Sequence, residues 1–98
     1  FRMRLRIKYA GPVASMLGRR EEIMDVDVEL TLRELLERLV DSHGKGLRDE
    51  VFDDDGKRIR DGALVVVNGV AVDRLEGLNT KLKEGDTVSL LPWFPGGG

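Results

Sequence analysis

The sequence predicts an α+β fold in which a mixed sheet of about five strands is covered on one face by one main helix. Its 98 residues are enough for a single domain. Two segments of alternating apolar and polar residues precede one strongly amphipathic helical segment, and shorter apolar segments follow it. This order has too few helices for a parallel sheet wound on both faces. A sheet rich in antiparallel pairs, with the helix on one side, is therefore the simplest packing.

The two alternating segments are residues 3–9 and 22–30. In the first, Leu5, Ile7 and Tyr9 share one face, and basic residues occupy the other. That basic face is either a docking patch or, more commonly, a solvated strand face that discourages edge pairing. Between the segments, Pro12–Leu17 predicts a short helix, because proline suits a first helical turn. The second segment is expected to point these residues inward: Met24, Val26, Val28 and Leu30.

The main helix is predicted to begin after Thr31, which forms a capping box with Glu34. Its apolar stripe has helical spacing and consists of Leu32, Leu35, Leu36, Leu39 and Val40. Gly44 is expected to end the helix. His43, the only histidine, is expected to be structural, because a catalytic imidazole needs a positioned partner and the sequence indicates none.

The segment after the helix contains a run of three aspartates, Asp53 to Asp55, followed by Gly56. This run does not fit an EF-hand, because position 1 of the loop would be Val51 and position 12 would be Gly62. We therefore interpret Asp55-Gly56 as a tight turn. A further short turn is expected just before it, at residues 47–52.

The remaining strands are predicted at residues 64–67, 70–72 and 87–91, with an irregular connection at 75–82. Asn68-Gly69 indicates a type I′ hairpin turn between the first two of these strands. The complete order is that of the ubiquitin-like roll, or β-grasp. In such a roll the first and last strands can lie side by side at the centre of the sheet.

The end of the sequence is its most informative stretch. Residues 1–91 are predicted to form the domain, and residues 92–98 an extended, flexible tail, because prolines and glycines oppose regular structure. Glycines can enter a narrow tunnel in a partner, and a terminal carboxylate on Gly98 can be activated as an acyl group. The alternative is a frayed end or a linker.

The composition excludes several classes of protein. Cysteine is absent, so disulfides, thiolate metal sites and a cysteine nucleophile are excluded, and a reducing cytoplasm is the expected location. The net charge of −2 argues against binding nucleic acid or an anionic membrane surface. No catalytic constellation is apparent, so an enzyme that acts alone is the least expected class. No metal site is expected, and Met3 is the expected native start.

The sequence resembles the MoaD/ThiS family of sulfur-carrier proteins, and most closely its branch of molybdopterin synthase small subunits. The resemblance rests on residues 3–9, on the helix opening at 31–36, on Val67-Asn68-Gly69, and on Leu82–Val88 followed by proline and the terminal glycines. The family pattern ends in two glycines, whereas a third, Gly96, precedes the pair here.

The resemblance implies a chemistry and a set of partners. A MoeB-like adenylating (E1-like) enzyme would use ATP to activate the Gly98 carboxylate, and a sulfur donor protein would convert the adenylate to a thiocarboxylate. The chain itself would bind no cofactor. A MoaE-like large subunit would then accept the tail, with Gly96 and Gly97 in its tunnel. Trp93, Phe94 and Pro95 are expected to dock on the partner, as aromatic anchors do.

Three functions stay open at this point. The first is a sulfur carrier for molybdopterin, that is, for molybdenum cofactor biosynthesis. The second uses the same activated terminus as a protein modifier, or as a sulfur carrier for tRNA thiolation. The third is a non-covalent ubiquitin-like docking module, for which the tail would be irrelevant.

Overall fold

The structure is a computed structural model and describes residues 1–92. The elements follow one another as β1 (Met3–Tyr9), α1 (Gly11–Leu17), β2 (Glu21–Val26), α2 (Leu32–His43), α3 (Lys45–Val51), β3 (Ala63–Val67), β4 (Val70–Ala71), two 3₁₀ turns (Val72–Arg74 and Gly77–Asn79) and β5 (Thr87–Pro92). No helix in this described part is long and apolar enough to cross a membrane.

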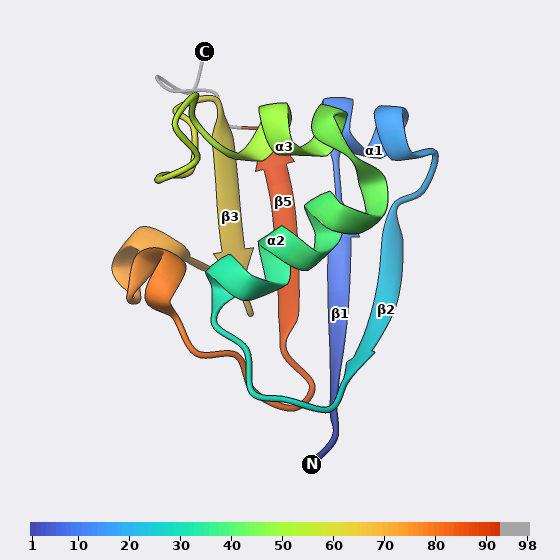
Figure 1. Ribbon diagram of the computed structural model, residues 1–98, viewed down its shortest axis with the longest axis vertical. Helices are drawn as coiled ribbons and strands as arrows, with labels where there is room; N and C mark the ends of the chain where they lie inside the picture. Colours follow the sequence, from blue (N-terminus) through green and yellow to red (C-terminus); the bar gives the residue numbers. More distant parts are fainter. Residues whose placement is uncertain (93–98) are drawn as a thin grey trace.

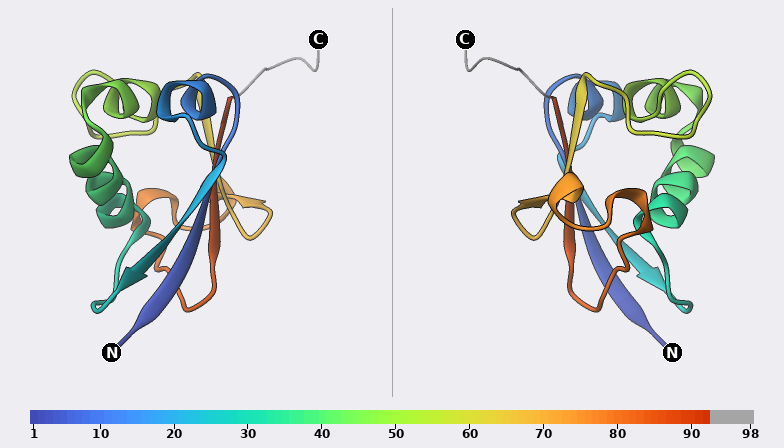
Figure 2. Two further views of the ribbon diagram at one scale, coloured as in Figure 1. Left: turned by 90° about the vertical axis from the view of Figure 1, so that its right-hand side faces the viewer. Right: turned by 90° about the vertical axis from the view of Figure 1, so that its left-hand side faces the viewer.

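The five strands form one mixed sheet in the order β2-β1-β5-β3-β4 (Figure 1). β5 lies in the middle, parallel to β1 and antiparallel to β3. The predicted fold class is thus confirmed, including the pairing of the first strand with the last. Helices α2 and α3 lie on one side of the sheet, and no α-helix of residues 1–92 lies on the other (Figure 2).

The interior position of β1 corrects one sequence-based interpretation. Because β1 has a partner strand on each side, its basic face cannot serve to discourage edge pairing. Instead its arginines face acidic residues of the neighbouring strand β2. Arg4 Nε lies 2.9 Å from Asp25 Oδ1, and Arg6 Nε lies 3.8 Å from Glu21 Oε2.

Helix α2 begins as the sequence predicts. The Thr31 amide donates to Glu34 Oε1 at 2.9 Å, and the Glu34 amide donates to Thr31 Oγ1 at 3.3 Å. The hydrogen bond from the Thr31 backbone lowers the pKa of the Glu34 carboxyl. The helix ends at Gly44, whose φ of +93° favours glycine.

The core lies between α2, α3 and the inner face of the sheet. Its fully buried side chains are Leu5, Ile7, Leu32, Leu35, Leu36, Leu39, Leu47, Val51, Val65 and Val88. The apolar stripe of α2 and the alternation of β1 supply most of them. The apolar faces that the helical and strand periodicities predict thus pack together in one core.

Strand β2 is shorter than its alternating pattern indicates. It ends at Val26, and the chain bends at residues 27 and 28. Val28 is therefore 45% exposed and not inward as expected, whereas Leu30 is buried. The bend starts the connection that leads to Thr31, and that connection is anchored where the Leu82 amide donates to the Leu30 carbonyl at 3.0 Å.

The β3–β4 hairpin has the predicted turn. Asn68 and Gly69 have φ values of +51° and +84°, as both central residues of a type I′ turn require. β4 is one residue shorter than expected, because Val72 already begins a 3₁₀ turn.

Candidate functional site at the end of strand β5

Strand β5 leads directly to the residues in which the sequence places the chemistry. Its backbone is paired on both sides, with Leu90 opposite Tyr9 of β1 and Pro92 opposite Ala63 of β3. Val88 and Leu90 are almost fully buried. Beyond the parallel pairing, the Ala10 amide donates to the Leu90 carbonyl at 3.2 Å. The strand ends at Pro92, one residue later than predicted, so the exit point of the chain is held firmly.

The start of α1 closes around this exit. Gly11 has a φ of +63°, and a Cβ at this position would lie only 3.0 Å from Pro92 Cγ. A cavity of about 50 Å³ lies beside Pro92, lined by residues of α1, α3, β3 and β5. This cavity could not hold a cofactor, because its lining is largely apolar and its volume is that of one or two water molecules.

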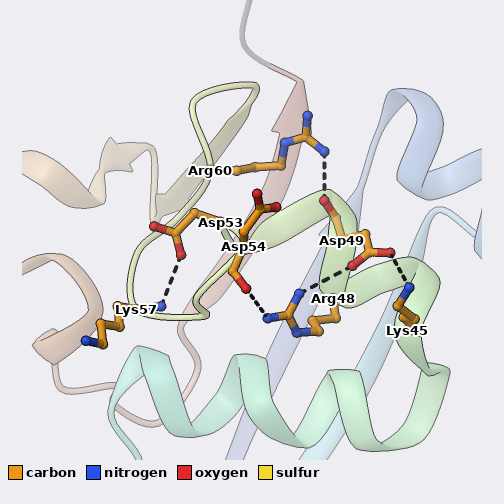
Figure 3. A network of polar contacts seen from close by, with 7 residues as sticks. All are labelled: Lys45, Arg48, Asp49, Asp53, Asp54, Lys57 and Arg60. Atoms are coloured by element: carbon orange, nitrogen blue, oxygen red, sulfur yellow. Dashed lines mark hydrogen bonds and ion pairs between the residues drawn. The ribbon is translucent and has the colours of Figure 1, made fainter.

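The loop of residues 53–62 borders the same end of the sheet and is anchored to α3 (Figure 3). Arg48 Nη2 donates to the Asp54 carbonyl at 3.1 Å, and Arg60 Nη1 donates to the Asp49 carbonyl at 2.7 Å. Asp53 Oδ1 accepts from the backbone amides of Lys57 and Arg58. The turn predicted at Asp55-Gly56 is confirmed, and the network fixes the start of β3, the partner of the last residues of β5.

The outer face of the sheet carries an apolar patch that sequence reasoning missed. Leu64 and Leu91 lie directly opposite each other there, and Val66 follows two residues along β3. All three are only partly buried, whereas Val65 and Val67 point into the core. The signal was present, because residues 63–67 are apolar without alternation, as in strands that need cover on both faces. We name these three residues the outer patch.

His43 has a partner after all, and this corrects the expectation that none would be present. His43 Nε2 lies 2.9 Å from Glu22 Oε2, and the Tyr9 hydroxyl donates to the same oxygen at 2.9 Å. Burial, reinforced by the Glu22 carboxylate, raises the pKa of the Tyr9 phenol. These three side chains connect α2, β1 and β2, and those of His43 and Glu22 are only 16% and 17% exposed. The cluster therefore supports a structural role for His43.

The predicted site residues themselves lie outside the described residues. This applies to Trp93, Phe94 and Pro95, expected to dock on a partner, and to Gly96, Gly97 and Gly98. The structure therefore places the strand that precedes them and does not test their roles. Among residues 1–92, no group of three or more His, Cys, Asp or Glu side chains is arranged to hold a metal ion.

Comparison with known proteins places this geometry in a family. No curated protein matches the sequence. Among solved structures, SAMP1 of Haloferax volcanii, a small archaeal modifier protein, is 32% identical, with a TM-score of 0.78 over 96% of this chain and 99% of that one.

Two further structures share the fold at lower identity. A putative molybdopterin converting factor subunit 1 of Pyrococcus furiosus is 23% identical, with a TM-score of 0.71 over 94% of this chain and 99% of that one. CysO of Amycolatopsis orientalis, solved in a complex with BexX, is 20% identical, with a TM-score of 0.74 over 95% and 99%. Residues 7–97 match the ThiS family. This chain therefore belongs to the ThiS/MoaD family of ubiquitin-like sulfur carriers.

Proposed function

We propose that this chain carries sulfur on the carboxyl group of Gly98 and donates it as the small subunit of a molybdopterin synthase. In this proposal Gly98 is the terminal residue of the working protein. The observation that carries it is the position of β5, which is paired on both sides and ends at Pro92, directly before residues 93–98 in the sequence. The match to the ThiS family, which extends through residue 97, supports the same assignment.

The chemistry requires activation, because a carboxylate is a poor electrophile. A carboxylate oxygen of Gly98 attacks the α-phosphorus of ATP and displaces pyrophosphate, which gives an acyl-adenylate with AMP as a good leaving group. The outer sulfur of a persulfide on a donor protein then attacks the carbonyl carbon and AMP leaves, which gives an acyl disulfide. A second thiolate of the donor protein attacks the donor's own sulfur in this bond and forms a disulfide with it, so that the thiocarboxylate is released. ATP is consumed by the activating enzyme, and this chain holds no cofactor in the scheme.

The partners proposed here are those that the family resemblance implies, and the geometry of the exit suggests where they would bind. An activating enzyme of the MoeB type that grips residues 93–98 must sit against the end of β5, where Leu91 and Leu64 are exposed in part. We propose that the outer patch packs against this enzyme and, in turn, against a large subunit of the MoaE type. Trp93, Phe94 and Pro95 would extend the contact, and Gly96 and Gly97 would occupy the tunnel.

A second function uses the same first step. The similarity to SAMP1, at 32% identity, favours a protein modifier, in which a lysine of a target protein attacks the activated carbonyl to form an isopeptide bond. Sulfur transfer to tRNA belongs to the same alternative, because it too begins with the adenylate.

Mass spectrometry of the protein from its native host separates these outcomes. A gain of about 16 Da on the C-terminal peptide, from exchange of oxygen for sulfur, identifies the thiocarboxylate. Branched Gly-Gly remnants on lysines of other proteins identify conjugation. Activity of the thiocarboxylate on a pterin precursor in the presence of a large subunit would then support the molybdopterin assignment. Unchanged function after deletion of Gly97 and Gly98 would contradict every form of the proposal.

The outer patch has its own test. Leu64→Glu should abolish adenylation by the activating enzyme, measured as ATP–pyrophosphate exchange, because a buried carboxylate at the interface has no partner. Ile23→Glu is the matched control, since Ile23 lies on the same outer face but on the edge strand β2 and is 47% exposed. Both variants should melt close to wild type. Equal exchange rates for the two would exclude the patch from the interface.

A further inference from the structure

Strand β2 forms an open edge of the sheet. Among residues 1–92 it pairs with β1 alone, and it is six residues long, whereas the opposite edge is the two-residue β4 (Figure 1). An edge strand presents unpaired backbone groups to any extended segment that reaches it. β2 is separated from β5 by β1, so this edge is distinct from the site described above.

The ladder shows which backbone groups are free. The Tyr9 amide donates to the Arg20 carbonyl, and bonded and non-bonded pairs alternate along an antiparallel ladder. The residues bonded to β1 are therefore Glu22, Met24 and Val26. The amides and carbonyls of Glu21, Ile23 and Asp25 consequently point away from β1, toward the open edge.

β2 lacks several protections of an edge strand, and its charged residues are all acidic. It contains no lysine and no proline, and its register with β1 runs without a bulge from Val26 to Glu21. Ile23 is 47% exposed and Val28, just beyond the strand, is 45% exposed. The edge therefore offers both hydrogen bonds and apolar side chains.

The charge of the edge selects the partner. Glu21 and Asp25 share the outer face with Ile23 and are paired with Arg6 and Arg4 of β1, at 3.8 Å and 2.9 Å. Asp27 and Glu29 continue the acidic run, and all four acidic residues are exposed. Because exposed ion pairs are weak, the edge stays acidic. A second copy of β2 in a symmetric antiparallel pair centred on Ile23 would set Glu21 opposite Asp25 twice, and like charges directly opposite are destabilising. Arg19, just before the strand, is already paired with Glu22. The edge thus suits a basic strand better than its own copy.

We infer that the β2 edge binds, by strand addition, an extended segment of a partner protein in which lysines or arginines alternate with apolar residues. The main-chain bonds of Glu21, Ile23 and Asp25 supply affinity, and their side chains select basic and apolar neighbours. The inference does not depend on the chemistry at Gly98.

The test uses the full chain, labelled with ¹⁵N, and the probe peptide acetyl-Lys-Val-Lys-Val-Lys-Thr-amide. Binding should perturb the amide signals of β2 and slow hydrogen exchange at Glu21, Ile23 and Asp25. Ile23→Pro removes one outward amide without removing a bond to β1, so it should weaken binding roughly tenfold. Ile23→Thr keeps the amide and should weaken binding less than Ile23→Pro does.

A second measurement keeps the inference testable if Ile23→Pro unfolds the chain. The same peptide with glutamates in place of the lysines should bind wild-type chain roughly tenfold more weakly, because it opposes the acidic edge. Equal binding of the two peptides would overturn the inference. So would perturbations confined to β4 or to the outer patch, or self-association of the chain through β2.

Discussion

Replacing Gly11 with alanine should destabilise this protein more than the same replacement at Gly18. Both glycines have positive φ, +63° and +68°, so both alanines suffer the strain of the left-handed region. They differ in what the new methyl group meets. At Gly18 the methyl carbon meets no atom of the described residues within 4 Å beyond its chain neighbours, whereas at Gly11 it lies 3.0 Å from Pro92 Cγ and 3.2 Å from Pro92 Cδ.

The magnitudes follow from these two contributions. The left-handed conformation costs an alanine about 1–2 kcal/mol, and this amount applies to both variants. Overpacking costs about 1–3 kcal/mol more, and applies to Gly11→Ala alone. Because the Pro92 ring is only partly buried and can shift, we expect the lower end. Gly11→Ala should therefore lose about 1 kcal/mol more free energy of unfolding than Gly18→Ala.

Urea denaturation of the intact chain measures the difference. The double variant Gly11→Ala with Pro92→Ala provides the control, since it removes Cγ and Cδ but keeps the strained backbone. Measured against the single variant Pro92→Ala in a double-mutant cycle, the added loss from Gly11→Ala should fall to that of Gly18→Ala. Equal losses for Gly11→Ala and Gly18→Ala, or an added loss that does not fall in the double variant, would refute the close packing of α1 against the end of β5.

Three further predictions address the scaffold. Thr31→Ala should lower the free energy of unfolding by about 1 kcal/mol, measured by urea denaturation, because it removes the hydroxyl that accepts from the Glu34 amide. Thr31→Ser keeps a hydroxyl at this position and should retain most of the stability. The folded-state pKa of Tyr9 is raised above 10.0, so the stability that its protonated phenol contributes is present below pH 10 and lost as pH rises through the folded pKa. Tyr9→Phe should therefore flatten the alkaline loss of stability, and a wild-type phenol that titrates near 10 in absorbance would contradict its burial against Glu22. Leu39→Ala should cost about 2–5 kcal/mol in the same denaturation assay, and a smaller loss would indicate that the core relaxes around the cavity.

The features that the sequence predicted correctly are those set by neighbours along the chain. The capping box needs only Thr31 and Glu34, three residues apart. The hairpin turn needs only Asn68 and Gly69, which are adjacent. The helical stripe of α2 is equally local, and the order of elements then restricted the topology to a roll.

The features that it missed depend on contacts between distant segments. The hydrogen bonds shared by Tyr9, Glu22 and His43 join three elements, so no local sequence pattern predicts them. The ion pairs of Arg4 and Arg6 depend on the register of β1 against β2, which brings Arg4 opposite Asp25. The alternating pattern predicted the wrong orientation for Val28, because the chain leaves the sheet before this residue. The roles of residues 93–98 stay predictions.

The placement of β5 also bears on how the protein is made. β5 is the last strand in the sequence but the middle strand of the sheet. During synthesis the β1–β2 hairpin and α2 can form early, whereas β1 and β3 gain their common neighbour only when residues 87–92 leave the ribosome. Such long-range pairing slows folding. An incompletely translated chain would lack the centre of its sheet and expose apolar strand edges, as aggregation-prone and protease-sensitive intermediates do. Full-length translation thus becomes a precondition for presenting residue 92 in its place.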